Sequence, residues 1–184
     1  MIKLFVGNNN FRRGVVMSSE IEKKYLTDLE VVSLAIDIED RGYEFYTMAS
    51  EKFSNDKKIK EFFDEMAREE LMHKSKFEEL YRKLLDEKKG DDSAYFDIEA
   101  SIYLTMLYKT SVFPSKDSVN EVLKKINTYE DAIELAIRAE KDSIIFYDEI
   151  VKDAKFDSTK KVAITLLNEE IKHFIDLSNM IKAI

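Results

Sequence analysis

Residues 57–88 read KKIKEFFDEMAREELMHKSKFEELYRKLLDEK, and this stretch decides the fold. Its apolar side chains recur every three or four residues, which is the spacing of one face of an α-helix. The predicted inward face consists of Ile59, Phe63, Met66, Glu70, His73, Phe77, Leu80 and Leu84. Glu70 and His73 interrupt this apolar face, and side chains three residues apart on a helix can reach the same ion. The stretch therefore predicts a long helix with a candidate metal-binding pair near its centre.

The same pattern recurs near the C-terminus. Residues 158–183 predict a helix whose inward face carries Val162, Leu166, Glu170, His173, Leu177 and Ile181. The chain contains only two histidines, and each follows a glutamate by three residues. One Glu-x-x-His match would be weak evidence, because such short motifs also arise by chance. Two copies that use every histidine of the chain indicate a shared metal site.

Each of these helices is preceded by another with a single glutamate on its inner face. Thr27 and Thr128 each precede an acidic residue by three, which is a capping-box pattern and predicts helices over 28–52 and 129–152. The inner faces correspond as Ala35, Glu39 and Tyr46 in the first helix and Ala136, Glu140 and Tyr147 in the second. The chain is therefore an internal repeat of two αα-hairpins.

Four inward glutamates at one level of a bundle need a compensating positive charge. Burying one ionised carboxylate without a partner costs roughly several kcal/mol of folding free energy. Four of them together would therefore stay ionised only if cations lay between them. Taken alone, a glutamate on a helix is usually solvated and a histidine on an apolar face is usually a core residue. Together, the glutamates and histidines predict a site for two divalent metal ions.

The composition predicts one soluble, helix-rich domain. The chain has 184 residues, of which 45% are hydrophobic and 36% charged, with four glycines and one proline. A formal net charge of -8 disfavours a nucleic-acid surface. No apolar run reaches the roughly 20 residues that span a bilayer, and the absence of cysteine excludes disulfides and thiolate metal sites. We therefore expect a cytoplasmic protein that binds neither nucleic acid nor membrane.

The first residues differ in composition from the rest. Residues 1–17, MIKLFVGNNNFRRGVVM, hold two of the four glycines and three consecutive asparagines. We expect residues 1–18 to form a flexible N-terminal extension. Arg12-Arg13-Gly14 can be encoded by a purine-rich stretch that resembles a ribosome-binding site, so we hypothesise that Met17 is the true start. Residues 19–184 then form the helical domain.

The repeated residues resemble the ferritin-like di-iron carboxylate proteins, and most closely their rubrerythrin branch. In that pattern two helices supply one Glu each and two supply a Glu-x-x-His each. The resemblance covers residues 27–183 and implies an all-α, ferritin-like four-helix bundle. The metal ligands that it implies are Glu39, Glu70, His73, Glu140, Glu170 and His173. Glu39 and Glu140 would be terminal ligands. Glu70 and Glu170 would bridge the metals, and each histidine would cap one metal.

The resemblance also assigns a role to two tyrosines, and the chain differs from rubrerythrins in two respects. Tyr46 and Tyr147 would be hydrogen-bonded to the metal ligands. Rubrerythrins carry a C-terminal rubredoxin module with paired Cys-x-x-Cys motifs, whereas this chain has no cysteine, so its electrons must come from an external donor. Rubrerythrins also have an extra Glu at the position of Ser143, and Gly42 takes the equivalent place in the first half. The remaining ligand set looks like the symmetric centre of bacterioferritins.

The connection between the two hairpins, residues 89–128, is too long for a tight turn and resembles the ferritin-like crossover. Its first part, 95–113, is rich in aromatic and aliphatic residues and predicts a helix, and a short helix is expected near 117–126. These apolar residues could simply cover the bundle. They could instead form a dimer surface or a lid over the metals, since homodimers are common among such bundles.

Carboxylate and imidazole ligands suit iron or manganese, and the lack of thiolates disfavours structural zinc. Two bridged ions would lie about 3.5 to 4 Å apart. The leading hypothesis is a rubrerythrin-like di-iron oxidoreductase active against oxidative stress. It would reduce hydrogen peroxide, or dioxygen, with two Fe ions and electrons from a donor such as a rubredoxin-like protein. Three alternatives remain open from the residues: a ferroxidase or iron-storage protein, a di-manganese catalase, and a metal-free helical interaction module.

Overall fold

The computed structural model describes residues 25–87, 95–110, 113–115 and 117–182. The helices in these residues are α1 (Asp28–Lys52), α2 (Lys57–Glu87), α3 (Ile98–Thr110), α4 (Val119–Lys125), α5 (Tyr129–Asp153) and α6 (Asp157–Lys182). The only β pairing in the described part of the chain is an isolated bridge between Thr27 and Tyr95. The expected all-α fold is confirmed. The expected N-terminal extension, 1–18, lies outside the described residues.

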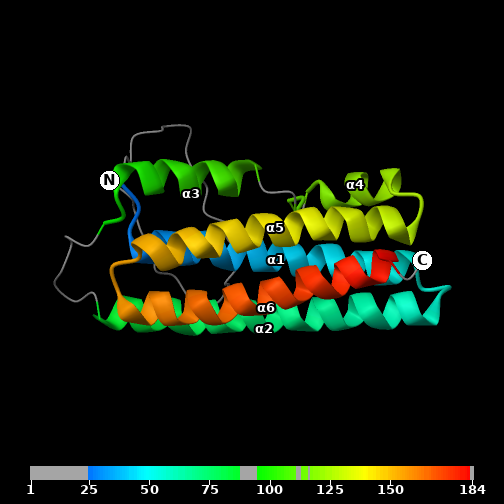
Figure 1. Cartoon of the computed structure of the whole chain (residues 1–184), viewed down its shortest axis with the longest axis horizontal. Helices are drawn as coiled ribbons and strands as arrows, with labels where there is room; N and C mark the ends of the chain where they lie inside the picture. Colours follow the sequence, from blue (N-terminus) through cyan, green and yellow to red (C-terminus); the bar gives the residue numbers. More distant parts are fainter. Residues whose placement is uncertain (1–24, 88–94, 111–112, 116, 183–184) are drawn as a thin grey trace, which may run out of the picture.

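Four long helices form an elongated bundle, in which α1 pairs with α2 and α5 pairs with α6 (Figure 1). These are the two predicted hairpins, and the helix ends agree with the sequence prediction to within one residue. Both predicted capping boxes are present: Thr27 caps α1 with Glu30, and Thr128 caps α5 with Asp131. Asp56 accepts hydrogen bonds from the first backbone N–H groups of α2 and so begins that helix.

The predicted inward faces form the core of the bundle. Every predicted inward residue of α1, α2 and α5 is buried. In α6 the prediction is less accurate, because Val162 and Ile181 are only half-buried whereas Thr159 and Ala163 are fully buried. Along α2, buried Phe63 and Met66 precede the polar residues at the middle of the bundle, and buried Phe77 and Leu80 follow them. No helix in the described residues is long and apolar enough to cross a membrane.

The crossover contains both expected helices. Figure 1 shows α3 and α4 on the same side of the bundle, outside α1 and α5 and away from α2 and α6. Helix α3 buries Ala100, Ser101 and Leu104 and leaves Ile102, Tyr103 and Met106 exposed. Between the two helices, the ring of Phe113 packs against Phe45 and Tyr46. The crossover therefore covers one face of the bundle, and the dimer and lid roles stay predictions.

Candidate metal centre

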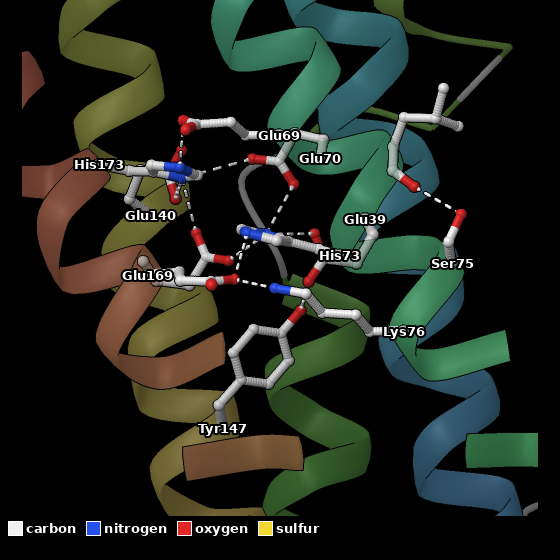
Figure 2. Close-up of polar contacts among 12 residues, drawn as sticks. Glu39, Glu69, Glu70, His73, Ser75, Lys76, Glu140, Tyr147, Glu169 and His173 are labelled. Atoms are coloured by element: carbon white, nitrogen blue, oxygen red, sulfur yellow. Dashed lines mark hydrogen bonds and ion pairs between the residues drawn. The ribbon is translucent and has the colours of Figure 1, made fainter. Parts of the chain in front are cut away.

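The structure brings all the predicted ligands into one cluster at the middle of the bundle. One group comes from α1 (Glu39), two from α2 (Glu70, His73), one from α5 (Glu140) and two from α6 (Glu170, His173). Each of these residues is at most 4% exposed. The long helices therefore carry the groups on the matching inner positions that the internal repeat predicts, and the fold turns them toward a common centre (Figure 2).

The two Glu-x-x-His pairs lie face to face. Ligand atoms of Glu70, His73, Glu170 and His173 all lie within 4.8 Å of one another. The two imidazole rings are stacked, with 5.2 Å between their centroids. Glu170 lies between the rings, with one oxygen 2.8 Å from His73 Nδ1 and the other 3.2 Å from His173 Nδ1. The Glu70 oxygens are farther from the same nitrogens, at 4.0 and 3.9 Å.

Several atoms of the cluster are buried without a hydrogen-bond partner in the described structure. They are Glu70 Oε1, His73 Nδ1, Glu140 Oε2 and Glu170 Oε1, although His73 Nδ1 and Glu170 Oε1 lie within ion-pair distance of each other, at 2.8 Å. A buried polar atom without a partner is costly, and native proteins rarely leave several together. Because these atoms belong to carboxylates and imidazoles that converge on one centre, a cation there would satisfy all of them. The donor set therefore fits a metal centre.

In each glutamate of α1 and α5, one carboxylate oxygen contacts a tyrosine and the other faces the centre. The Tyr46 hydroxyl donates to Glu140 Oε1, and the Tyr147 hydroxyl donates to Glu39 Oε1. The other oxygens face inward, with Glu39 Oε2 3.5 Å from His73 Nδ1 and Glu140 Oε2 3.8 Å from His173 Nδ1. Each hydrogen bond joins α1 to α5, so the tyrosine of one hairpin orients the glutamate of the other.

Burial and charge shift the pKa values in the cluster strongly. Burial raises the pKa of Glu70 well above its usual value, and the nearby Glu39 raises it further. Burial and Glu170 together raise the pKa of Glu140 to about 8. Burial alone would lower the pKa of both histidines, but the surrounding carboxylates raise it to about 10 for His73 and about 12 for His173. Without metal, the cluster therefore keeps protons that a cation would displace.

Sequence reasoning missed two glutamates that hold the histidines from outside. His73 Nε2 lies 3.0 Å from Glu169 Oε2, and His173 Nε2 lies 2.8 Å from Glu69 Oε2 (Figure 2). Each contact again joins the two hairpins, here between α2 and α6. A carboxylate on Nε2 keeps the proton there and leaves Nδ1 free for a metal. The sequence does show two consecutive glutamates at each place, Glu69-Glu70 and Glu169-Glu170. Only the second glutamate of each pair belongs to a Glu-x-x-His motif, so the first one was overlooked.

Comparison with known proteins agrees with this geometry. The rubrerythrin family model matches residues 30–181. The chain belongs to the rubrerythrin family. Among solved structures, it is similar to a candidate ferritin-like diiron-carboxylate protein from Thermotoga maritima, with 25% sequence identity and a TM-score of 0.62. That similarity covers 86% of this chain and 96% of the other. No curated protein matches the chain at a significant level. The resemblance inferred from the two Glu-x-x-His pairs is confirmed.

The extra glutamate that the resemblance to rubrerythrins predicts is replaced by Ser143, and Gly42 takes the equivalent place in the first half. At Gly42, an added Cβ would lie 3.0 Å from Glu70 Cδ and 3.1 Å from Glu70 Oε2. Gly42 therefore gives the Glu70 carboxylate room that any side chain would fill. Ser143, at the matching place in α5, is buried. The two halves thus differ at Gly42 and Ser143, which hold matching places in the repeat, although their predicted ligands match.

Proposed function

We propose that the chain is a di-iron oxidoreductase that reduces hydrogen peroxide, or dioxygen, with electrons from an external donor. The observation that best supports this proposal is the buried cage of carboxylates and imidazoles, in which several inward atoms lack a hydrogen-bond partner in the described structure. In this cage Glu39 and Glu140 would serve as terminal ligands and Glu70 and Glu170 as bridging ligands. His73 and His173 would each bind one metal.

Two ferrous ions held there supply, when bound, the two electrons that reductive cleavage of an O–O bond requires. Hydrogen peroxide accepts these electrons with two protons and leaves as two molecules of water. The chain has no cysteine, so its residues provide no thiolate redox centre that could return the electrons. We therefore assign the return of electrons to a separate donor, such as a rubredoxin-like protein.

The tyrosines keep the terminal carboxylates in position during this cycle. Burial raises the pKa of Tyr46 well above its usual value, and Glu140 raises it further. Burial and Glu39 act on Tyr147 in the same way. Both phenols therefore stay protonated and donate to the outer oxygens of the glutamates. The inner oxygens keep their direction toward the centre, which limits the rearrangement that binding requires.

Aromatic side chains exclude water from the same region. Tyr46 is surrounded by Phe45, Phe63 and Phe113, with ring centroids 5.3 to 6.2 Å away. On the other side, Phe77 lies 5.3 Å from the Tyr147 ring. In such apolar surroundings, charges interact more strongly than in water. This environment favours a small substrate such as peroxide or dioxygen over a large organic one.

The first test is an anaerobic titration of metal-free protein with ferrous ion, followed by stopped-flow mixing with hydrogen peroxide or oxygen in separate experiments. We expect two irons per chain and a ferric charge-transfer absorbance that develops much faster with peroxide than with oxygen. A parallel titration with Mn²⁺ compares the two metals, because this ligand set suits both.

Each other outcome removes a defined part of the proposal. A faster reaction with oxygen, with iron loading that continues beyond two per chain, would replace peroxide reduction with ferroxidase or storage chemistry. Rapid release of oxygen from peroxide by the manganese form alone would indicate a catalase. The absence of any metal binding would refute the metal centre itself.

A further inference from the structure

The two histidines of the cluster are held by outer carboxylates in the same way, but the carboxylates have different neighbours. On one side, Lys76 Nζ lies 2.5 Å from Glu169 Oε2, which is the same oxygen that faces His73 Nε2 at 3.0 Å. Figure 2 shows this chain of contacts from His73 through Glu169 to Lys76. The Glu169 oxygen is therefore shared between an imidazole and an ammonium group.

The corresponding carboxylate on the other side, Glu69, has different neighbours among the described residues. Glu69 Oε2 lies 2.8 Å from His173 Nε2. The residue that follows His173 by three positions, as Lys76 follows His73, is Asp176. In the described part of the chain, no lysine or arginine lies in ion-pair contact with Glu69, and Lys172 acts on it only at longer range. The negative charge of Glu69 is therefore directed mainly at His173.

This difference changes how strongly each imidazole can bind a metal. A carboxylate on Nε2 increases the electron density of the ring and so its basicity toward a metal on Nδ1. Lys76 reduces that effect for His73, because the ammonium competes for the same oxygen. The ammonium charge also disfavours a nearby dication. Both effects act in one direction, although solvent screens them, since the Glu169 side chain is 33% exposed.

We propose that Lys76 makes the two metal positions unequal, so that the ion at His73 is held more weakly than the ion at His173. The inference rests on the metal centre of the proposed function and adds the order in which its two positions bind metal. The His173 position fills first, and the His73 position is the one from which an ion exchanges. Changes to the outer contacts of metal-binding histidines typically alter affinity about 10- to 100-fold. We expect a value near the lower limit here.

The test is anaerobic calorimetric titration of the metal-free, full-length chain with Co²⁺, which reports binding without any catalytic turnover. Wild type should bind two ions in steps whose affinities differ about 10-fold. In Lys76→Met, the weaker step should tighten toward the stronger one. The matched control is Lys74→Met, which removes an ammonium from the same helix but one that pairs with Asp40 instead. It should leave the two steps unchanged.

Two further variants identify the positions. His173→Ala leaves the His73 position, and His73→Ala leaves the His173 position. The remaining site should bind Co²⁺ about 10-fold more weakly in His173→Ala than in His73→Ala. Combining each variant with Lys76→Met should remove this difference. Asp176→Lys, which places an ammonium on the other side, should weaken the stronger step of the otherwise wild-type chain.

The possible results separate this inference from the proposed function. Two equal steps in wild type, or a weaker second step in Lys76→Met, would overturn the inequality while leaving a two-metal centre in place. The second result would mean that Lys76 acts mainly by ordering Glu169. If wild type binds no Co²⁺ or Fe²⁺, the metal centre and the inference fail together. Thermal melting of each variant checks that it is folded, and Lys76 is exposed enough (41%) for its replacement to be tolerated.

Discussion

The hairpin of α1 and α2 and the hairpin of α5 and α6 supply the same groups to the centre but surround them differently. Each contributes a glutamate held by a tyrosine of the other hairpin, and a Glu-x-x-His pair held by a glutamate of the other hairpin. They differ at Gly42, which corresponds to Ser143, and at Lys76, which corresponds to Asp176. The groups that face the centre match, and so do the tyrosines and glutamates that contact them, whereas the residues at these two further positions differ. A symmetric set of predicted ligands can therefore have unequal surroundings.

The difference extends to the two central glutamates. Glu170 contacts both histidines closely, whereas Glu70 lies about 4 Å from each and leans into the space left by Gly42. The two histidines hold the pKa of Glu170 below its usual value, although burial acts in the opposite direction. Burial and Glu39 raise the pKa of Glu70. Without metal, Glu170 is therefore the ionised partner of two imidazoles, and Glu70 carries a proton.

The largest effect should come from removing the charge of each central glutamate in turn. In the metal-free protein, Glu170→Gln removes the carboxylate closest to Nδ1 of both His73 and His173, and breaking a buried ion pair costs about 3 to 5 kcal/mol. Glu70→Gln replaces a protonated carboxyl with a group of the same size, so it should change the free energy of unfolding by less than about 1 kcal/mol. Urea denaturation in the presence of a chelator measures both values.

This pair of variants is its own control, because the two residues share size, burial and place in the repeat. Equal losses of stability would show that the two hairpins hold their central charges alike. A larger loss in Glu70→Gln than in Glu170→Gln would reverse the comparison. Metal titration of the same proteins should show weaker binding in both, since each loses a carboxylate ligand.

The next effect is a dependence of the metal-free protein on pH. The pKa of His73 in the folded state is about 10, above the usual 6.5. A raised pKa stabilises the folded state fully below the unfolded value, and this contribution is lost as the pH rises through the folded value. Glu140, whose pKa is raised from 4.5 to about 8, loses its contribution over a lower range. The free energy of unfolding should therefore fall between pH 6.5 and 10, by about 1.4 kcal/mol per pH unit for each proton.

Metal should reverse this trend, because the cation takes the place of these protons and binds more tightly as they leave. The melting temperature of the metal-loaded protein should exceed that of the metal-free protein by a margin that grows across the same range. His73→Gln should make the metal-free slope shallower, since one titrating group is gone. A flat profile in the metal-free wild type would mean that the histidines are not held protonated by the carboxylates.

Replacing Tyr46 and Tyr147 tests whether their corresponding hydrogen bonds contribute equally to stability. Tyr46→Phe and Tyr147→Phe each remove one buried hydrogen bond to a glutamate, which should cost about 1.5 to 3 kcal/mol if the acceptor is charged. Because burial and Glu170 raise the pKa of Glu140 to about 8, this carboxyl is mostly protonated at neutral pH. The loss in Tyr46→Phe should therefore lie at the lower end of that range. Chemical denaturation measures the losses, and exposed Tyr103→Phe serves as the control. Losses no larger than in the control would show that the hydrogen bonds do not hold the carboxylates.

Much of this arrangement could be predicted from the sequence, because it depends on spacing along single helices. The capping boxes at Thr27 and Thr128 and the three-to-four periodicity of 57–88 define where the helices lie and which faces are buried. The internal repeat then predicts that Glu39 and Glu140 lie at the same level of the bundle. These features are local, so one sequence is enough to predict them.

The remaining contacts join different hairpins and could not be predicted in this way. Spacing along α1 brings Tyr46 near Glu39, yet the Tyr46 hydroxyl donates to Glu140 on the opposite helix. The pairing of Glu169 with His73 likewise depends on how α2 lies against α6. Outside residues such as Glu169 also follow no ligand pattern, since a half-exposed glutamate on a helix is ordinarily a solvated residue. Their role becomes visible only when the distance between helices is known.

The smallest effect on stability, but an informative one, is expected from Gly42→Ala. Alanine in the middle of a helix is favoured over glycine by about 1 kcal/mol. The added Cβ would, however, lie 3.0 Å from Glu70 Cδ, and overpacking of this kind costs about 1 to 3 kcal/mol. Because the atom in the way lies at the far end of a flexible side chain, we expect the cost at the lower limit of this range, where the two terms nearly cancel. The melting temperature of the metal-free protein should then change little. The Glu70 carboxylate, by contrast, must move out of the space beside α1.

Metal binding should therefore reveal the displacement of the Glu70 carboxylate, although the melting temperature does not. With its carboxylate displaced, Glu70 should bind Co²⁺ less well, and the calorimetric titration of Gly42→Ala should show weaker binding of at least one ion. Ser143→Ala, the matching change in the other hairpin, removes atoms rather than adding them and should leave both steps nearly unchanged. If Gly42→Ala binds as wild type does, the carboxylate has a second position of equal quality. In that case the space beside Gly42 does not set the two hairpins apart, and the contact between Lys76 and Glu169 would remain as the source of their inequality.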